Sequence, residues 1–284
     1  MIEQRTTNVT VYRFGADGRA ASNDQLAVEE PLEIRLEYGA AEARTRKSIS
    51  ITMRTPGDDF ALAAGFLFTE QIVQHAAQIE RIRFCGPPVG EQRLRNIVRV
   101  VLRPDAEVDM QRLERHFYTT SSCGVCGKTS IEALGLDSCP HLPTAGPIIE
   151  ARLIHQLPER LRAAQEIFDH TGGLHAAALF SADGALDLVR EDVGRHNAVD
   201  KLIGTRLLAG QLNMHNQLLF VSGRASFELT QKALVAGIPI LAAVGAPSSL
   251  AVALAHEHQL TLIGFVRDQR FNVYTCPWRL ADSL

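Results

Sequence analysis

The first hundred residues of the chain alternate apolar and polar positions in several short runs. Residues 32–38 and 49–53 each place an apolar side chain at every second position. A period of two is typical of a strand with one buried face. Residues 81–84 and 96–102 are predicted as two more strands, with a Gly- and Pro-rich loop between them. This part of the chain is expected to form a small α+β unit.

A helix is predicted between the second and third of these strands. Thr55 could cap it, Pro56 would occupy its first position and Asp58 its third, ahead of the apolar run 60–68. Proline is tolerated in the first turn because the missing N–H has no intrahelical partner there. The helix is therefore expected to begin at Pro56.

The pattern changes after residue 173, where strand-like and helix-like runs begin to alternate. Residues 174–180 and 186–189 flank a Ser-Ala-Asp-Gly turn and are predicted as a hairpin. The remaining predicted elements are a helix over 197–208, a strand over 218–221, a helix over 227–236, a strand over 238–244, a helix over 248–258 and a strand over 261–265. This order indicates a mixed α/β sheet covered by helices. The domains are expected to comprise residues 1–115 and 116–284, with 140–147 as another possible junction.

Composition and charge narrow the class of protein. The 284 residues have a formal net charge of −3, which argues against a nucleic acid as a bulk partner. No run is long and apolar enough to span a membrane, and the N-terminal residues lack a secretory signal pattern. A cytoplasmic location is the expectation.

Two of the five cysteines form a Cys-x-x-Cys pair, Cys123 and Cys126, within the polar, Gly-rich segment 119–128. Such a segment suits an exposed loop. It runs into a plausible helix start at residues 129–134, with Lys128 close by, and that setting favours the thiolate form of cysteine. The sequence thus predicts at least one accessible, nucleophilic sulfur.

Three chemistries are open to this pair when it is taken by itself. A redox pair of the thioredoxin type normally follows a strand, which the Thr/Ser run before Cys123 matches poorly. A structural zinc site needs about four ligands, and Cys139 and His141 could complete one, although Cys-Pro-His is a cramped chelate. The third is a sulfur-relay cysteine, which attacks a donor persulfide and presents its outer sulfur to an acceptor.

Polar side chains gather where three predicted strands end, a common ligand position in α/β sheets. Residues 192–201 include Arg195, His196 and Asn197; the alternative is a capped helix start, with Arg195 four residues after Glu191 and Lys201 solvated. His175 is expected by default to be a core histidine.

The turn 222–226 follows an apolar strand and precedes a helix, so its glycine permits close backbone approach and its arginine could bind phosphate. Residues 265–270 begin where the predicted strand over 261–265 ends. Their two arginines suit phosphate and their aspartate can accept hydrogen bonds from a guanine edge, unless they are simple surface pairs. We expect both loops to lie at one edge of the sheet.

Five segments in order resemble the formate dehydrogenase accessory sulfurtransferase family, FdhD: TPGDDFALAAGFLFTE, SSCGVCGK, EDVGRHNAVDK, VSGRASFELTQKA and GFVRDQRFNVYT. They extend over residues 55–275. The resemblance implies a cytidine-deaminase-like fold for the second domain. It also implies a sulfur carrier that takes persulfide sulfur from a cysteine desulfurase. The sulfur passes to the bis(molybdopterin guanine dinucleotide) molybdenum cofactor for formate dehydrogenase.

The resemblance also assigns roles to residues. Cys123 would carry the persulfide and Cys126 would be a second thiol. The residues expected to contact the cofactor, or a guanine nucleotide such as GDP, are Arg195, His196, Asn197, Ser222, Gly223, Arg224, Phe265, Val266, Arg267, Asp268, Gln269 and Arg270. Deaminase chemistry is not expected, because the chain has neither the H-x-E nor the P-C-x-x-C motif.

The leading interpretation is therefore a sulfurtransferase that needs no zinc. Its expected partners are a cysteine desulfurase and formate dehydrogenase, with neither nucleic acid nor membrane, and a homodimer is compatible with the sequence. Two alternatives from other classes stay open: a non-catalytic chaperone of the cofactor or apo-dehydrogenase, and a zinc-stabilised binding module.

Overall fold

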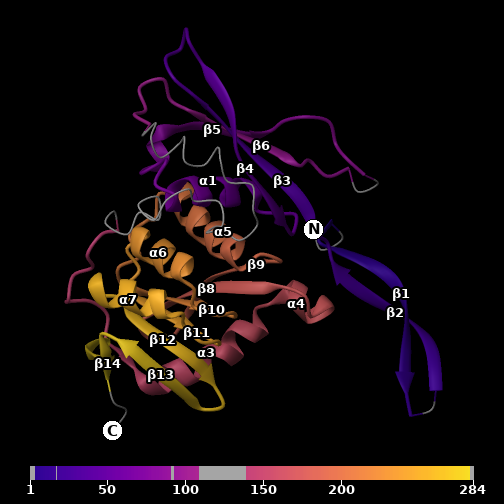
Figure 1. Ribbon diagram of the computed structural model, residues 1–284, viewed down its shortest axis with the longest axis vertical. Coiled ribbons are helices and arrows are strands. Elements are labelled where there is room, and N and C mark those ends of the chain that lie inside the picture. The colour runs from indigo at the N-terminus through magenta and orange to yellow at the C-terminus, as the bar shows by residue number, and fades with distance from the viewer. Residues whose placement is uncertain (1–3, 17, 91–92, 109–138, 282–284) are drawn as a thin grey trace.

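The computed structural model describes residues 4–16, 18–90, 93–108 and 139–281 (Figure 1). The Cys-x-x-Cys segment, including Cys123 and Cys126, lies outside the described residues. Within them, two larger sheets and their helices form the body of the molecule, and the chain is a mixed α/β protein. No helix among the described residues has the length and apolar character needed to cross a membrane.

The N-terminal residues form a two-stranded ribbon that projects from the body (Figure 1). Strands β1 (Thr6–Gly15) and β2 (Gly18–Ala27) pair antiparallel along their whole length. The ribbon leaves Tyr12 and Phe14 largely exposed. No pattern in the sequence predicted the ribbon, because it lacks the buried face whose alternating apolar positions indicate a strand.

A four-stranded sheet follows, built from β3 (Glu30–Tyr38), β4 (Thr45–Arg54), β5 (Ile79–Phe84) and β6 (Ile97–Leu102) in the order β4-β3-β6-β5. These are the four strands that the alternation predicted. One face carries Leu32, Ile34, Leu36, Val98 and Val100, and helix α1 (Asp59–Thr69) covers it with Leu62 and Leu67. A short 3-10 turn, η2 (Ala76–Gln78), leads into β5.

Helix α1 begins at Asp59, and the predicted start at Pro56 was wrong. Gly57 and Asp58 both have positive φ, at 99° and 56°, so the backbone turns there instead of entering the helix. The Asp58 carboxylate forms an ion pair with Arg5 and makes no capping hydrogen bond. The Thr55 hydroxyl accepts a hydrogen bond from the Val193 N–H, so the supposed capping residue serves a distant contact.

The second sheet has six strands in the order β13-β12-β11-β10-β8-β9. Its strands are β8 (His175–Ser181), β9 (Leu186–Asp192), β10 (Gln217–Val221), β11 (Ile240–Ala243), β12 (Thr261–Arg267) and β13 (Arg270–Thr275). Strands β10, β11 and β12 are parallel, and the others join the sheet antiparallel. The predicted hairpin and the predicted mixed sheet are confirmed.

Helices cover both faces of this sheet. On one face α5 (Arg195–Leu208), α6 (Phe227–Val235) and α7 (Ser249–Glu257) pack against Leu179, Leu219, Leu241 and Leu262. On the other, α3 (Ala151–Ala163) packs against Phe180, Phe220 and Ile263. The remaining elements are α4 (Glu166–Thr171), η5 (Pro277–Arg279) and the short parallel pair β7 (Ile149–Glu150) and β14 (Leu280–Ala281). Helices α3 and α4 were not predicted from the sequence.

The two sheets meet through helices α1 and α5, which lie against each other between them (Figure 1). The contact depends on two glycines. A Cβ atom on Gly65 would lie 1.9 Å from the Asp200 carbonyl oxygen, and one on Gly204 would lie 1.8 Å from that of Ala61. Since real atoms do not approach so closely, the backbones can cross at this distance only with glycine at both positions.

We therefore predict that Gly65→Ala destabilises the protein by about 3 kcal/mol or more, because the methyl group would push the two helix backbones apart. Urea unfolding followed by far-UV circular dichroism measures the effect. Gly15→Ala is the matched control, since a Cβ atom there meets nothing within 4 Å. Equal stability of the two variants would contradict this account of the crossing.

Candidate functional site

The parallel strands β10, β11 and β12 end at the same edge of the six-stranded sheet, and the loops that follow them are bonded into one row. The Gly245 N–H donates to the Gly223 carbonyl at 2.9 Å, and the Phe265 N–H donates to the Gly245 carbonyl at 3.1 Å. We call residues 222–226, 244–248 and 264–265 the strand-end rim. The expectation that loops 222–226 and 265–270 share one edge is confirmed, with the loop after β11 between them.

The strand-end rim is glycine-dependent at its centre. A Cβ atom on Gly245 would lie 3.0 Å from the Cγ atom and 3.1 Å from the Cα atom of Arg224. One on Gly264 would lie 2.8 Å from the Pro247 Cδ atom. The three loops can therefore lie close together, and the exposed Arg224 side chain rests across Gly245.

His175 reaches the strand-end rim from the other direction, because β8 runs antiparallel to β10. The Ala176 N–H donates to the Ser222 hydroxyl at 2.9 Å, which fixes the start of β8 beside the turn. The His175 ring lies next to Gly223 and close to the Arg195 side chain. Burial, followed by the Arg195 guanidinium, lowers the pKa of His175, so its ring is held neutral.

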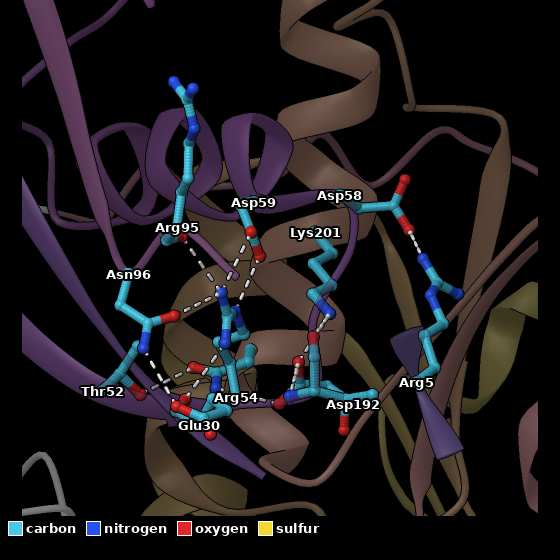
Figure 2. A network of polar contacts seen from close by, with 12 residues as sticks. Arg5, Glu30, Thr52, Arg54, Asp58, Asp59, Arg95, Asn96, Asp192 and Lys201 are labelled. Carbon is cyan, nitrogen blue, oxygen red and sulfur yellow. Dashed lines mark hydrogen bonds and ion pairs between the residues drawn. The ribbon is translucent and has the colours of Figure 1, made fainter. Parts of the chain in front are cut away.

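The loop from β9 into α5 completes this edge and is held by a buried carboxylate (Figure 2). Asp192 is fully buried, and its carboxylate accepts hydrogen bonds from the Thr55 N–H at 3.1 Å, the Gly194 N–H at 2.8 Å and the Asn197 amide at 2.9 Å. The Lys201 ammonium lies 2.6 Å from it and also donates to the Thr55 carbonyl. The N-terminus of α5 is thereby fastened to the end of β4.

A second buried pair continues the network into the four-stranded sheet (Figure 2). The Arg54 guanidinium bonds both oxygens of the Asp59 carboxylate, at 2.8 and 3.2 Å, and contacts Asn96 at 3.3 Å. Arg54 is fully buried and Asp59 nearly so. The first turn of α1 is therefore fixed to β4 beside the Asp192 network.

His196 lines a cavity of about 320 Å³ that lies between α1, β3, β4, the start of α5 and the last turn of α6. Glu70, Asp200 and Lys232 also line it. Lys232 and Asp200 form a buried ion pair at 2.8 Å, and the Thr69 hydroxyl donates to the same carboxylate. The His196 Nε2 atom lies 3.8 Å from Glu228 and makes no hydrogen bond within the described residues.

The segment 265–270 forms the end of the β12–β13 hairpin. Asp268 and Gln269 both have positive φ, at 52° and 56°, and Arg267 pairs with Arg270 across them. Arg267, Asp268, Gln269 and Arg270 are exposed, whereas Val266 is fully buried in the core. The hairpin thus presents two arginines beyond the strand-end rim.

The structure contradicts two features of the alternative in which residues 191–201 are only a capped helix start. That alternative left Lys201 solvated, but Lys201 is fully buried against Asp192. It also paired Glu191 with Arg195, but the Glu191 carboxylate accepts hydrogen bonds from the Ile167 and Phe168 N–H groups at the start of α4. The carboxylates of Asp192 and Glu191 both accept hydrogen bonds from distant segments of the chain, Thr55 for the first and residues 167–168 for the second. A local helix pattern does not reveal such partners.

Asn197 has its amide committed to protein contacts. It donates to the Met53 carbonyl at 2.8 Å and to Asp192, and it accepts from the Thr52 hydroxyl at 3.2 Å. Asp192 was expected only as one of several polar groups at a strand end, and Arg54 and Asp59 were not expected to organise the site. All three stand in polar, turn-like segments, where nothing in the sequence distinguishes a charge that will be buried from one that stays solvated.

No group of three or more His, Cys, Asp or Glu side chains within the described residues is placed to hold a metal ion. Cys139 is buried, and His141 stacks on His258 with ring centroids 4.5 Å apart. The expectation that zinc is not required stays a prediction, because Cys123 and Cys126 lie outside the described residues.

The surroundings of His196 predict a pH-dependent stability. Burial, followed by the charges of Lys232 and Arg195, lowers its pKa to about 4, against the opposing pull of Glu228 and Glu70. The unfolded chain, with an ordinary histidine pKa of about 6.5, then binds the proton more readily. Stability should be full above pH 6.5 and fall by on the order of 2 to 3 kcal/mol as the pH drops toward 4.

Urea unfolding at several pH values tests this, together with the NMR titration of the ring. His196→Gln should remove that share of the pH dependence, while the control His215→Gln, at an exposed position, should leave it unchanged. A His196 ring that titrates near its ordinary pKa would contradict the prediction.

Comparison with known proteins adds the relationships of the whole chain. Residues 27–281 match the model of the FdhD/NarQ family. The chain is 52% identical over 268 residues to the sulfur carrier protein FdhD of Streptomyces avermitilis, covering 93% of this chain and 92% of that protein. It is 46% identical over 275 residues to the sulfur carrier protein FdhD of Mycobacterium tuberculosis, covering 95% and 96%.

A solved structure agrees over nearly the full length. The crystal structure of a protein from Desulfotalea psychrophila, assigned as a formate dehydrogenase accessory protein, superimposes with a TM-score of 0.72 at 26% identity. The match covers 97% of this chain and 99% of that one. The family match over most of the chain and the identity to these relatives establish that this protein belongs to the FdhD/NarQ family.

Proposed function

We propose that this protein is a sulfurtransferase that supplies sulfur to the molybdenum cofactor of formate dehydrogenase. In this proposal a cysteine desulfurase presents a persulfide, and the Cys123 thiolate attacks its outer sulfur. The S–S bond of the donor breaks, the donor thiolate leaves, and Cys123 becomes the persulfide. Its outer sulfur then passes to the bis(molybdopterin guanine dinucleotide) cofactor, which is the substrate. The S–S bond on Cys123 breaks, Cys123 leaves as a thiolate, and the transferred sulfur takes two electrons from the reduced molybdenum of that substrate.

The location of the described cysteines supports the Cys-x-x-Cys segment, which holds Cys123, as the sulfur carrier. Cys139 and Cys276 are 6% and 4% exposed, so neither can meet a partner's persulfide. Burial also raises the pKa of the Cys276 thiol, which disfavours the nucleophilic thiolate. Cys85 directly follows β5 and is partly exposed, so it belongs to the four-stranded sheet and not to the six-stranded sheet that carries the strand-end rim. The names of the relatives, sulfur carrier proteins, point to the same chemistry.

The strand-end rim supports the role of a nucleotide-bearing substrate. Arg195, Arg224 and the pair Arg267 and Arg270 come from three loops at one edge of the sheet, and arginine binds phosphate through paired hydrogen bonds. The Ser222–Gly223 turn leaves space for close backbone approach. The proposal takes the six-stranded sheet and its helices as a cytidine-deaminase-like scaffold. It excludes deaminase chemistry, because both deaminase motifs are missing from the sequence.

The alternative is a chaperone that binds the cofactor or the apo-dehydrogenase without carrying sulfur. The polar rim would serve that role equally well, because binding alone needs no thiol. Persulfide formation on Cys123 distinguishes the sulfurtransferase from the chaperone.

Incubation with a cysteine desulfurase and cysteine should therefore add sulfur to the protein, and a reductant should remove it. Intact-mass analysis measures the addition. Cys123→Ala should abolish both the sulfur adduct and formate dehydrogenase maturation, and Cys85→Ala should change neither. Maturation at the wild-type level by Cys123→Ala would overturn the sulfurtransferase and leave the chaperone.

Guanine nucleotide binding tests the strand-end rim independently. GDP should bind more tightly than ADP in calorimetry, and Arg267→Ala/Arg270→Ala should weaken GDP binding by about tenfold or more, since each charge-assisted contact contributes roughly 1.5 to 3 kcal/mol. Arg103→Ala, an exposed arginine outside the six-stranded sheet, is the control. Equal affinity for GDP and ADP would show that the rim does not read the base.

A further inference from the structure

The four-stranded sheet has a second face, opposite α1, that carries a concentration of arginines. The core face holds the apolar positions of β3, β5 and β6, so the alternate positions point the other way. None of the described helices has its apolar residues packed on that second face. We call it the arginine face, and define it by Glu33, Arg35, Glu37, Arg46, Arg81, Arg83 and Arg99.

Three of these arginines stand in one row across three strands. Arg35 of β3 lies directly opposite Arg99 of β6, and Arg99 lies directly opposite Arg83 of β5. Like charges at directly opposite positions of a sheet repel each other and destabilise it. In the adjoining row, Arg46 of β4 lies opposite Glu37, and Arg81 of β5 lies opposite Val101.

Two carboxylates of this face pair with three of these guanidinium groups, and Arg81 lies 4.0 Å from Glu80, whose carboxylate also pairs with Arg44. Glu33 is bonded by Arg35 through both oxygens at 2.7 Å. Glu37 is bonded by Arg46 at 2.8 Å and by Arg99 at 3.5 Å. The Glu37 carboxyl remains charged, because these arginines and Arg83 lower its pKa against the effect of burial. Five arginines against two glutamates leave this face with a formal charge of +3, in a chain whose net charge is −3.

The exposure of the arginines leaves them available to a partner. The Arg46 and Arg81 side chains are 61% and 54% exposed, and Arg83 is exposed at the edge strand. Arg99 is mostly buried among them, and its Nε atom has no hydrogen-bond partner within the described residues. The positive charges of this face therefore repel one another, and its own glutamates neutralise them only in part.

We propose that the arginine face is a docking surface for an acidic helix of a protein partner. Neighbouring strands are about 4.8 Å apart, so the row of Arg35, Arg99 and Arg83 repeats at roughly that interval. Carboxylates three or four residues apart on a helix repeat at about 5 to 6 Å. One acidic helix laid across the strands can thus place successive carboxylates over successive arginines.

The interleaved glutamates favour a protein over a nucleic acid. Glu33 and Glu37 flank Arg35 on β3, opposite Ile97 and Val101, so a phosphate backbone avoids their carboxylates only if it keeps to the single arginine row. A helix can instead leave small or donor side chains at those positions. The inference goes beyond the proposed sulfur transfer and does not depend on it.

The test uses the full chain and two synthetic helical peptides of equal length, one with glutamate and one with glutamine at successive i, i+4 positions. The glutamate peptide should bind more tightly at low salt, and added salt should weaken it. Arg81→Glu/Arg83→Glu should weaken that binding by about tenfold, since attraction at two positions becomes repulsion. Arg13→Glu/Arg19→Glu on the β1–β2 ribbon changes the net charge equally and should have no effect.

Arg83→Gln, which removes one charge at an exposed edge position, is measured beside them and should weaken binding by about threefold. This variant keeps the test decisive if the double reversal does not fold. Equal loss in the ribbon control, no loss in Arg83→Gln, or tighter binding of single-stranded DNA than of the glutamate peptide would each overturn the proposal. Sulfur loading of Cys123 by inorganic polysulfide is followed in the same samples. Failure of loading in the wild type counts against the sulfur carrier and not against the docking surface.

Discussion

The Asp192 carboxylate is the contact on which the arrangement of the site depends. It is buried completely and is satisfied by two backbone N–H groups, an amide and the Lys201 ammonium. A carboxylate without such partners would cost several kcal/mol to bury, so the network forms as a unit or not at all. Because its donors come from Thr55 just after β4, from the β9–α5 loop and from α5, one side chain fixes the start of α5 against the first sheet. This contact also sets the positions of Arg195 and His196, because they are the first two residues of α5.

The crossing of α1 and α5 also joins the two sheets, through direct contact between the two helix backbones. Gly65 and Gly204 let the helices touch, and the buried pairs Arg54–Asp59 and Lys232–Asp200 lie on either side of that contact. Apolar packing alone is tolerant of small shifts, whereas hydrogen bonds to buried charges are directional. The junction therefore holds the two sheets in one relative position, and the loops that carry the candidate ligand residues are placed on a rigid frame.

Charge is distributed unevenly over this frame, and the distribution matches a protein that meets several partners. Arginines extend beyond the strand-end rim on the β12–β13 hairpin, where a phosphate-bearing substrate is proposed to bind. Others are gathered on the arginine face of the first sheet, which is separated from that rim by the whole α1–α5 layer (Figure 1). A substrate and a protein partner could be held at once, because neither surface overlaps the other.

Apolar alternation was enough to predict strands of the first sheet, and short apolar runs separated by polar turns were enough to predict the parallel strands of the second sheet and the helices between them. The sequence by itself also determined that loops 222–226 and 265–270 share an edge, since parallel strands end together. The tertiary structure alone decided the burial of Lys201, the partners of Glu191 and the start of α1 at Asp59. Lys201 and Glu191 are buried against partners that lie more than twenty residues away in the chain, Thr55 for the first and residues 167–168 for the second. The start of α1 is set by the left-handed turn at Gly57 and Asp58. Periodicity records which face of an element is apolar, but it carries no information about which distant polar group will meet a buried charge.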